Sequence, residues 1–388
     1  MKDDTILTHG FRGPDPVTGA ISFPIFQSAT FRHNGLNQST GYDYSRAGNP
    51  TREELEKMMA LLEKGGKCWA FASGMAAVST VFRLLKPSQH VLLSEDLYGG
   101  THRIAEEIYK PYGIAFEYVD TSDIDCLSAM IRPNTSMIFV ETPSNPMMRV
   151  TDIAKVREVI AQRDILLVVD NTFLTPYLQK PIVLGADIVV HSGTKYLCGH
   201  NDVLAGFVIA NRRDGLAERL SRISISEGAI LGAFDSWLMI RSLKTLSVRL
   251  ERQENNALEI IRFLSGRPEV TKIYYVGMPG HPGYDTNRNQ ATGSGAMISF
   301  CLSSREHAAH VLENLHLIFF AESLGGVESL ITYPIVQTHA ETPDILKNRV
   351  GINDCLLRLS VGIEDVSDLI EDLLQAITSY KKPDKAGV

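Results

Sequence analysis

The sequence predicts an α/β protein built on a mostly parallel sheet that helices cover on both faces. Between residues 67 and 210, short apolar runs alternate with stretches of helical periodicity, the order that a parallel sheet with crossover helices requires. Several of these runs are apolar throughout, as is typical of strands buried on both faces. The chain has 388 residues, more than one hydrophobic core usually supports. We therefore expect a second, smaller domain.

Each expected element rests on its own local pattern. The strands of the large domain are expected at 68–72, 90–94, 115–119, 136–141, 165–170, 188–191 and 205–210. A helix is expected to start at Asn49 and Pro50, with a capping box formed by Thr51 and Glu54. Residues 1–50 contain several prolines and glycines and only short apolar runs, so they predict an extended arm of the kind that crosses a subunit interface.

The second half of the chain predicts a connector and a smaller domain. Residues 228–266 follow largely one helical pattern, which we interpret as a helix that connects the domains. Strands at 272–275, 296–301 and 356–360 and helices at 305–315 and 366–380 predict a smaller α/β domain, and residues 381–388 are expected to fray. The predicted organisation is an arm at 1–50, a large domain at 51–245 and a small domain at 246–388.

Composition and charge exclude several classes of protein. The chain is 44% hydrophobic and 21% charged, which is ordinary for a soluble globular protein. Its net charge is −7 and it has no basic block, so nucleic acid is not an expected ligand. The chain start lacks a signal-like apolar region, and no run approaches the ~20 apolar residues of a membrane span. We expect a cytoplasmic protein that does not bind membranes.

The cysteines and histidines do not predict a metal site. The five cysteines are scattered and odd in number, which indicates reduced, mostly buried thiols rather than disulfides or a structural zinc site. His307 and His310 lie three residues apart on a predicted helix, a spacing that metals can use. A solvated helix face is the favoured interpretation, and no metal is expected.

A lysine and an aspartate stand at the ends of two predicted buried strands. Asp170 closes the apolar run at 165–169, and Lys195 follows the run at 188–191. Such charges need partners, so the pair indicates a functional site rather than a surface lysine and a strand-end cap. The pair suits pyridoxal phosphate, whose aldehyde needs a lysine amine and whose ring nitrogen must stay protonated beside a carboxylate. The hydroxyls of Ser192 and Thr194 suit its phosphate group.

A second segment suits the same phosphate. Gly74 and Met75 follow the first strand and open a helix, so their backbone N–H groups can face an anion with help from the helix dipole. Small residues at such a turn are often there only for close packing. Because Ser192 and Thr194 come from another strand end, we predict the phosphate site between these segments.

Two further strand ends carry an aromatic ring and an amide. We expect Tyr98 to stack on the cofactor ring and to act in proton transfer, a structural tyrosine at a loop corner being the alternative. Asn145 lies between two prolines and is expected to donate to the phenolic oxygen of the ring. The strand ends meet at one edge of the sheet, where open α/β sheets bind ligands. The chain has no dinucleotide, Walker or nucleophile-elbow motif.

With these residues in place, the chain resembles, over nearly its whole length, the Cys/Met metabolism, or trans-sulfuration, family of pyridoxal-phosphate enzymes. The resemblance implies the aspartate aminotransferase-like fold type I. It also implies that Tyr44 and Arg46, within YDYSRAGNPT at 42–51, reach across a dimer to bind the neighbour's cofactor phosphate. Two such catalytic dimers are expected to form a homotetramer.

The same resemblance implies substrate roles in the second half of the chain. Arg358, in the segment 356–362, is expected to bind the α-carboxylate with bidentate geometry, the alternative being a paired core arginine. Ser323 and Asn145 are expected to help hold the substrate. Glu322 is expected to face the distal ammonium of cystathionine. Members that act on methionine usually have a cysteine at the position of Gly100, which makes methionine γ-lyase less favoured.

The predicted function is a pyridoxal-phosphate-dependent carbon–sulfur lyase that cleaves cystathionine by β- or γ-elimination. Cystathionine γ-synthase, which replaces the acyl group of an O-acylhomoserine with cysteine, is the main alternative. An aminotransferase and a non-catalytic binding protein are alternatives from other classes, and the four residues Lys195, Asp170, Tyr98 and Arg358 argue against the second. Because β- and γ-elimination can use the same residues, the sequence does not separate them.

Overall fold

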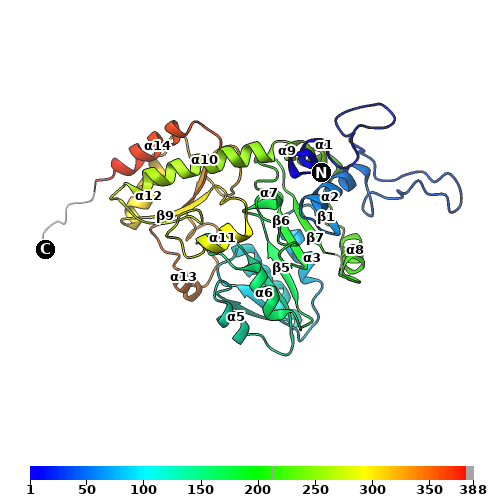
Figure 1. Cartoon of the computed structure of the whole chain (residues 1–388), viewed down its shortest axis with the longest axis horizontal. Helices are drawn as coiled ribbons and strands as arrows, with labels where there is room; N and C mark the ends of the chain where they lie inside the picture. Colours follow the sequence, from blue (N-terminus) through cyan, green and yellow to red (C-terminus); the bar gives the residue numbers. More distant parts are fainter. Residues whose placement is uncertain (212, 382–388) are drawn as a thin grey trace.

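The computed structural model describes residues 1–211 and 213–381, so the expected fraying of the chain end lies, from residue 382 onward, outside the described residues. The structure has two sheets, one toward the left and one toward the right in Figure 1, and the consecutive helices α9 (Ala233–Leu243) and α10 (Leu246–Ser265) run along the top of this view. The larger sheet is formed by the first half of the chain and the smaller by the second. This arrangement is the α/β architecture that the sequence predicts.

The larger sheet, within residues 1–211, has seven strands in the order β1-β7-β6-β5-β4-β2-β3. All neighbours from β3 to β6 are parallel, whereas β7 runs antiparallel to β6 and β1. The strands are β1 (Lys67–Phe71), β2 (His90–Ser94), β3 (Ala115–Val119), β4 (Thr135–Glu141), β5 (Leu166–Asp170), β6 (Ile188–Ser192) and β7 (Gly206–Ala210). The predicted strands are therefore confirmed to within one residue at each end.

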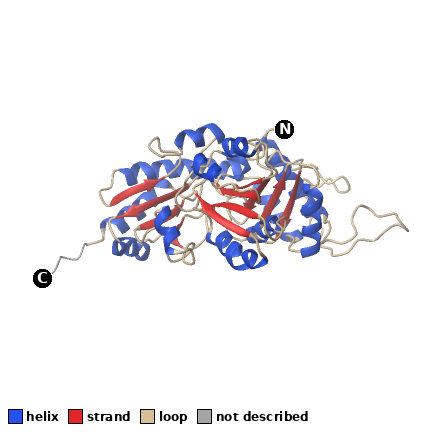
Figure 2. Ribbon diagram, turned by 90° about the horizontal axis from the view of Figure 1, so that it is seen from below, coloured by secondary structure: helices blue, strands red, loops and turns tan. Residues whose placement is uncertain are grey.

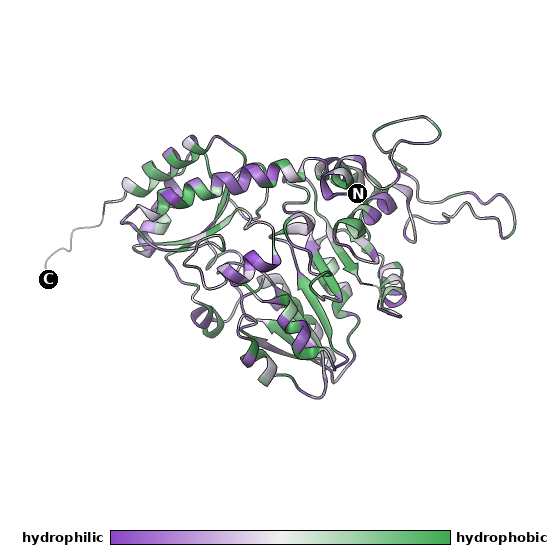
Figure 3. Cartoon of the chain, viewed as in Figure 1, coloured by the Kyte–Doolittle hydropathy of each residue, from purple (hydrophilic) through white to green (hydrophobic). Residues whose placement is uncertain are grey.

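Helices cover both faces of this sheet. Apolar side chains of α3 and α8 join one buried cluster, whereas those of α2, α5, α6, α7 and α9 join the other. The strands between them are the apolar layer that Figure 3 shows in green. The helices are α2 (Pro50–Leu62), α3 (Gly74–Phe82), α4 (Gly99–Arg103), α5 (Ile124–Ala129), α6 (Ile153–Ile160), α7 (Thr175–Leu178), α8 (Leu216–Glu227) and α9 (Ala233–Leu243), with a π-helical turn (Ile104–Tyr109) and a 3₁₀ turn (Lys110–Tyr112) after α4.

The smaller sheet, within residues 213–381, has five strands in the order β10-β11-β12-β9-β8. Its strands are β8 (Val270–Tyr274), β9 (Met297–Leu302), β10 (Phe319–Phe320), β11 (Leu330–Thr332) and β12 (Leu356–Ser360). The helices α10 (Leu246–Ser265), α12 (Arg305–Asn314) and α14 (Val366–Thr378) pack together against it, while α11 (Tyr284–Gln290) and α13 (Asp344–Val350) lie apart from them (Figure 1). The strands β10 and β11 were not predicted, because two or three residues are too few to show a period.

The predicted single connector helix is wrong, because α9 ends at Leu243 and α10 begins at Leu246. The backbone of Thr245 leaves the helical region, with φ −112° and ψ 8°, and its hydroxyl donates to the carbonyl of Ser242 at 3.1 Å. The Nη2 atom of Arg249 donates to the same carbonyl at 3.1 Å. The backbone N–H of Thr245 also donates to this carbonyl, at 3.2 Å, so the two side chains add to the backbone bond at the end of α9. The predicted domain boundary, after residue 245, falls at this break and stays a prediction.

The predicted arm differs from expectation at its start. Residues Asp3–His9 form the helix α1, which buries Ile6 and Leu7 against the body of the protein. The chain that follows projects away from the body in long loops (Figures 1 and 2) and exposes 88% of Val17 and 92% of Leu36. Only this second part of 1–50 has the extended form that the sequence predicts.

Three smaller expectations can also be compared with the structure. The capping box is wrong, because Asn49 caps α2 by accepting from the backbone of Thr51 and Arg52, and the Thr51 hydroxyl donates to Pro24 instead. His307 is buried rather than solvated, and its ring stacks on Tyr380 with centroids 4.4 Å apart. The cysteines are free thiols, and three of the five are buried.

Across the described ranges 1–211 and 213–381, there is no group of three or more His, Cys, Asp or Glu residues that could hold a metal ion. In the same part of the chain, no helix combines the length and apolar character needed to cross a membrane.

Candidate active site

A cavity of about 210 Å³ opens where the carboxyl ends of the parallel strands meet the smaller sheet. Every predicted site residue except Tyr44 and Arg46 lines it. These lining residues are Gly74, Met75, Tyr98, Asn145, Asp170, Ser192, Thr194, Lys195, Glu322, Ser323 and Arg358. The fold therefore brings together side chains that lie up to 284 positions apart, from Gly74 to Arg358.

Lys195 follows β6, and its side chain meets the smaller sheet. Its Nζ atom donates to the Oγ of Ser323 at 3.0 Å. Burial and the positive charge of Arg358 together lower the pKa of Lys195 to about 8, against an opposing contribution from Glu322. An amine with this pKa is present in its neutral, nucleophilic form near neutral pH far more often than an ordinary lysine.

Asp170 ends β5 and lies opposite Glu141 of β4 in the sheet register. Its Oδ1 accepts from the backbone N–H of Thr172 at 3.0 Å. Burial raises the pKa of Asp170, while the hydrogen bonds from Thr172 and the nearby His191 lower it. His191 is itself held by Glu63, with Nε2 and Oε1 2.6 Å apart and both side chains fully buried. A carboxyl group in this position can stay charged when a cation sits beside it.

The start of α3 faces the hydroxyls after β6. Ser73 caps α3 by accepting from the backbone of Ala76 at 3.1 Å, which leaves the N–H groups of Gly74 and Met75 outside the intrahelical pattern. A Cβ atom on Gly74 would lie 2.9 Å from the Cβ of Ser192, so glycine permits this close approach. Thr194 lines the cavity, with its hydroxyl bonded to the main chain of Ala205. The predicted phosphate segments are therefore adjacent.

Arg358 is the most buried charged group of the cavity, with 1% of its surface exposed. Its Nη1 donates to the Oδ1 of Asn145 at 2.7 Å, and its Nη2 donates to the carbonyl of Ser323 at 3.0 Å and the hydroxyl of Thr332 at 3.1 Å. Burial lowers its pKa to about 10. Among the described residues its buried Nε has no hydrogen-bond partner. An anion that entered the cavity would offset the cost of this buried cation.

Ser323 stands between the two cations of the site. Its side chain accepts from Lys195 and its carbonyl accepts from Arg358. Its φ angle is 102°, a region that non-glycine residues rarely adopt and that recurs at functional sites. Glu322, the residue before it, is exposed at the cavity wall.

Tyr98 and Asn145 hold their places through the main chain and the side chain respectively. The backbone N–H of Tyr98 donates to the Oε2 of Glu141 at 2.8 Å, and 41% of the Tyr98 surface remains exposed. The oxygen of Asn145 is engaged by Arg358, so its Nδ2 is the donor that remains for a ligand.

Tyr44 and Arg46 do not reach the cavity of their own chain. Half of the Tyr44 surface is exposed, and the Arg46 guanidinium lies 5.7 Å from the centre of the Tyr44 ring. The Nη1 of Arg46 donates to the carbonyl of Ile225. The structure of a single chain therefore does not bring these two residues to the site.

Sequence reasoning missed Glu141 and Thr332, which contact predicted site residues. Glu141 ends an apolar strand as Asp170 does, so the same strand-end signal could have identified it. Thr332 ends the three-residue strand β11, where no sequence pattern distinguishes it from a surface threonine.

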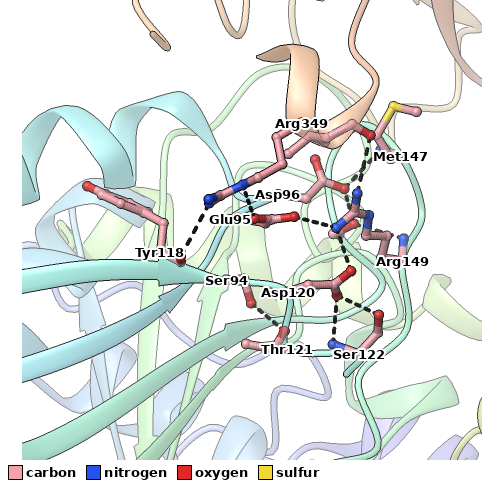
Figure 4. A network of polar contacts seen from close by, with 12 residues as sticks. Ser94, Glu95, Asp96, Tyr118, Asp120, Thr121, Ser122, Met147, Arg149 and Arg349 are labelled. Carbon is pink, nitrogen blue, oxygen red and sulfur yellow. Dashed lines mark hydrogen bonds and ion pairs between the residues drawn. The ribbon is translucent and has the colours of Figure 1, made fainter. Parts of the chain in front are cut away.

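A network of ion pairs lies outside the cavity and supports the loop that leads to Tyr98 (Figure 4). Arg149 bridges Glu95 and Asp120 at 2.7 and 2.8 Å, and Arg349 of α13 pairs with the other oxygen of Glu95. The Nη2 of Arg149 donates to the carbonyl of Val350 at 3.3 Å. These contacts thus connect α13, in the second half of the chain, to the loop after β2.

Comparison with known proteins identifies the family. The family model described as Cys/Met metabolism PLP-dependent enzyme matches residues 4–378. The chain belongs to this family. Its cofactor is pyridoxal 5′-phosphate, and it is an enzyme of fold type I, as the sequence predicts.

Three proteins that are similar to this chain have three different activities. A cystathionine γ-lyase of Bacillus subtilis (strain 168) is 46% identical, over 97% of this chain and 99% of the relative. A cystathionine β-lyase of Lactococcus lactis subsp. cremoris (strain MG1363) is 46% identical, over 96% of this chain and 98% of the relative. The solved structure of a cystathionine γ-synthase from Xanthomonas oryzae pv. oryzae, in complex with aminoacrylate and cysteine, matches with a TM-score of 0.95 at 37% identity. The match covers 97% of this chain and 98% of that structure's chain.

The residues that line the cavity supply the groups that this cofactor needs. Lys195 offers an amine with a lowered pKa, Asp170 offers a buried carboxyl group, and the start of α3 offers backbone N–H groups beside Ser192. These are the groups that an aldehyde, a pyridine nitrogen and a phosphate respectively require.

Proposed function

We propose that this protein cleaves cystathionine by β- or γ-elimination, as a pyridoxal-phosphate-dependent carbon–sulfur lyase. The observation that carries the proposal is the position of Ser323 between Lys195 and Arg358, with both hydrogen bonds at 3.0 Å. An α-amino acid presents its amino group and its carboxylate within one residue's length. Arg358 therefore suits the carboxylate of such a substrate, and the amine of Lys195 suits proton transfer at its α-carbon.

When bound, the cofactor supplies an electron sink for the bonds of the substrate's α-carbon. Asp170 would hold its ring nitrogen, and Ser192, Thr194 and the first N–H groups of α3 would hold its phosphate. Arg358 and Asn145 would orient the α-carboxylate. In this proposal Lys195 Nζ, with its pKa of about 8, takes the proton from Cα and returns a proton later in the cycle.

The substrate's far end meets the wall that carries Glu322. This carboxylate is exposed at the cavity and adjoins Ser323, so it suits the distal ammonium of a long, dibasic amino acid. Tyr98 lines the cavity from the loop after β2, and its phenol suits proton transfer to a departing sulfur.

Cystathionine γ-synthase is the second candidate, favoured by the close overall match to the Xanthomonas enzyme. The same Lys195, Arg358 and Asp170 would serve it. A synthase should require an O-acylhomoserine together with cysteine, whereas a lyase needs cystathionine alone.

We also propose a dimer in which Tyr44 and Arg46 complete the partner's phosphate site, with two such dimers in a tetramer, and a cytoplasmic location. The support is that both residues lie outside their own cavity, in the same arm segment whose apolar side chains Val17 and Leu36 are exposed. Exposed apolar surface of this kind is typical of a contact with another chain.

The test is to supply the purified protein with pyridoxal phosphate and cystathionine and to identify the products. Pyruvate with homocysteine would establish β-elimination, and 2-oxobutyrate with cysteine γ-elimination. No cleavage, together with cystathionine formation from an O-acylhomoserine and cysteine, would replace the lyase with the synthase.

A further inference from the structure

We propose that Glu141 is a positioning residue, whose carboxyl group holds the Tyr98 loop and the Asn145 loop in register over the cavity. The inference deepens the proposed function and rests on the roles proposed above for Tyr98 and Asn145. Glu141 itself has no part in the chemistry described so far.

The first support is the set of contacts of the carboxyl group. Its Oε2 accepts from the backbone N–H of Tyr98 at 2.8 Å. Asn145 follows Glu141 by four residues in the loop that leaves β4, and its backbone N–H acts to lower the pKa of Glu141. Asn145 in turn accepts from Arg358 at 2.7 Å. One side chain therefore connects the loop with the stacking ring to the residue that holds the carboxylate-binding arginine.

The second support is the burial of the group beside another carboxyl group. Only 6% of the Glu141 surface is exposed, although it lines the cavity, and it lies opposite Asp170 in the register of β4 and β5. Burial and the charge of Asp170 raise the pKa of Glu141 well above its usual range. A carboxyl group is costly to bury at such a place, so a purely space-filling role would be served better by an apolar residue.

The third support is how little room the Tyr98 loop has. A Cβ atom on Gly100 would lie 2.5 Å from Cε1 of the Tyr98 ring and 3.0 Å from the sulfur of Met75. His339 also approaches this loop, with Nε2 3.2 Å from the carbonyl of Leu97. Because the loop is closely packed on these sides, a shift of the Tyr98 backbone after loss of the Glu141 contact should be transmitted to the Tyr98 ring.

The test compares Glu141→Ala, which removes the acceptor, with Glu141→Gln, which keeps a carbonyl oxygen that can accept from Tyr98. The affinity of the cofactor-free protein for pyridoxal phosphate is titrated by absorbance, and kcat and KM are measured on the loaded protein. We expect Glu141→Ala to weaken cofactor binding about tenfold and Glu141→Gln to stay within about threefold of the original protein. Equal loss in both variants would overturn the inference.

A double-mutant cycle with Tyr98→Ala shows whether Glu141 acts through Tyr98. We expect Glu141→Ala to add little further loss of cofactor affinity once the ring of Tyr98 is removed. Fully additive losses would overturn the inference while leaving the proposed role of Tyr98 intact. An unchanged affinity in Tyr98→Ala alone would instead overturn the role of Tyr98, and the inference with it.

Asp372→Asn is the matched control. The Asp372 carboxylate is buried and accepts from the backbone N–H groups of His316, Leu317 and Ile318 at 2.8–2.9 Å, but it lies outside the cavity. This variant should lower the melting temperature without changing cofactor affinity. A loss of affinity equal to that of Glu141→Ala would show that general destabilisation explains both, and would overturn the inference.

Discussion

Charged residues have opposite surroundings in two regions of the molecule: the cavity floor, formed by Asp170, Lys195 and Arg358, and the part of the arm that follows α1. Arg358 is 1% exposed and has three hydrogen bonds to its own chain, whereas Arg46 is exposed on a loop that leaves the body. Asp170 and Lys195 likewise stand at ends of strands that are buried on both sides. The floor residue Arg358 is therefore held by three hydrogen bonds of its own chain, whereas the guanidinium of Arg46 has one, to the carbonyl of Ile225.

This contrast between buried and exposed charged residues indicates which residues a single chain can position. A buried cation must be compensated where it lies, so the floor residues have fixed partners before any ligand binds. Exposed groups on a long loop pay a large entropy cost to become ordered and usually gain that order from a second surface. Four predictions test whether the floor and the arm really act differently.

The largest effect is expected at the floor, from Lys195→Ala. Loss of the amine should lower kcat by about 10⁴-fold, because this group is proposed both to hold the cofactor and to move the Cα proton. The measurement is keto acid release at saturating cystathionine and cofactor. Lys180→Ala is the control, because this amine donates to the carbonyl of Leu62 outside the cavity. Activity of Lys195→Ala within tenfold of the original protein would contradict the mechanism.

The next effect is expected from Arg358→Ala. Removing a buried, hydrogen-bonded cation that binds the substrate carboxylate costs about 2–5 kcal/mol, so KM should rise by about 30-fold or more. Arg358→Lys should recover only part of this, since an ammonium cannot form the bidentate contact. Steady-state kinetics and a cofactor titration measure the two functions. If cofactor affinity fell as much as substrate affinity, the assignment of Arg358 to the substrate would be wrong.

A smaller effect is expected at the arm. Arg46→Ala should weaken pyridoxal phosphate binding by about tenfold, the loss of one charge-assisted hydrogen bond. The sharper experiment mixes Arg46→Ala chains with Lys195→Ala chains at limiting cofactor. If the arm serves the partner's site, a mixed dimer has one site with both an intact lysine and an intact arm, and activity returns. If activity does not return, the arm serves its own chain or none.

The smallest effect concerns the pH at which the floor lysine reacts. The pKa of Lys195 is lowered to about 8, so its amine is neutral above that pH rather than above the ordinary 10.5. The rate at which the cofactor-free protein takes up pyridoxal phosphate should rise with a midpoint near pH 8. In Arg358→Ala the midpoint should move upward, because a positive charge that lowers this pKa is gone. A midpoint near 10.5 in the original protein would contradict the burial of the amine.

Some of the site could be predicted because its signal is local. Asp170 and Lys195 each follow an apolar run, and parallel strands bring such ends to one edge wherever they occur. Glu141 has the same signal but was not assigned a role, since its significance depends on which loop its carboxyl group meets. The break between α9 and α10 was missed because the hydrogen bonds of Thr245 and Arg249 to the carbonyl of Ser242 leave no mark on the helical periodicity.

The sequence by itself determined the fold class, the order of the parallel strands' apolar segments, the lysine and carboxylate pair and, through resemblance, the family. Periodicity and residue type are properties of short segments, so they can be read without coordinates. Three facts emerge only from the tertiary structure: Ser323 lies between Lys195 and Arg358, Glu141 accepts from the backbone of Tyr98, and Tyr44 and Arg46 stay outside their own cavity. These facts depend on contacts between residues far apart in the sequence, with separations of 128 for Lys195 and Ser323, 43 for Tyr98 and Glu141, and 35 for Ser323 and Arg358, and no local pattern encodes them.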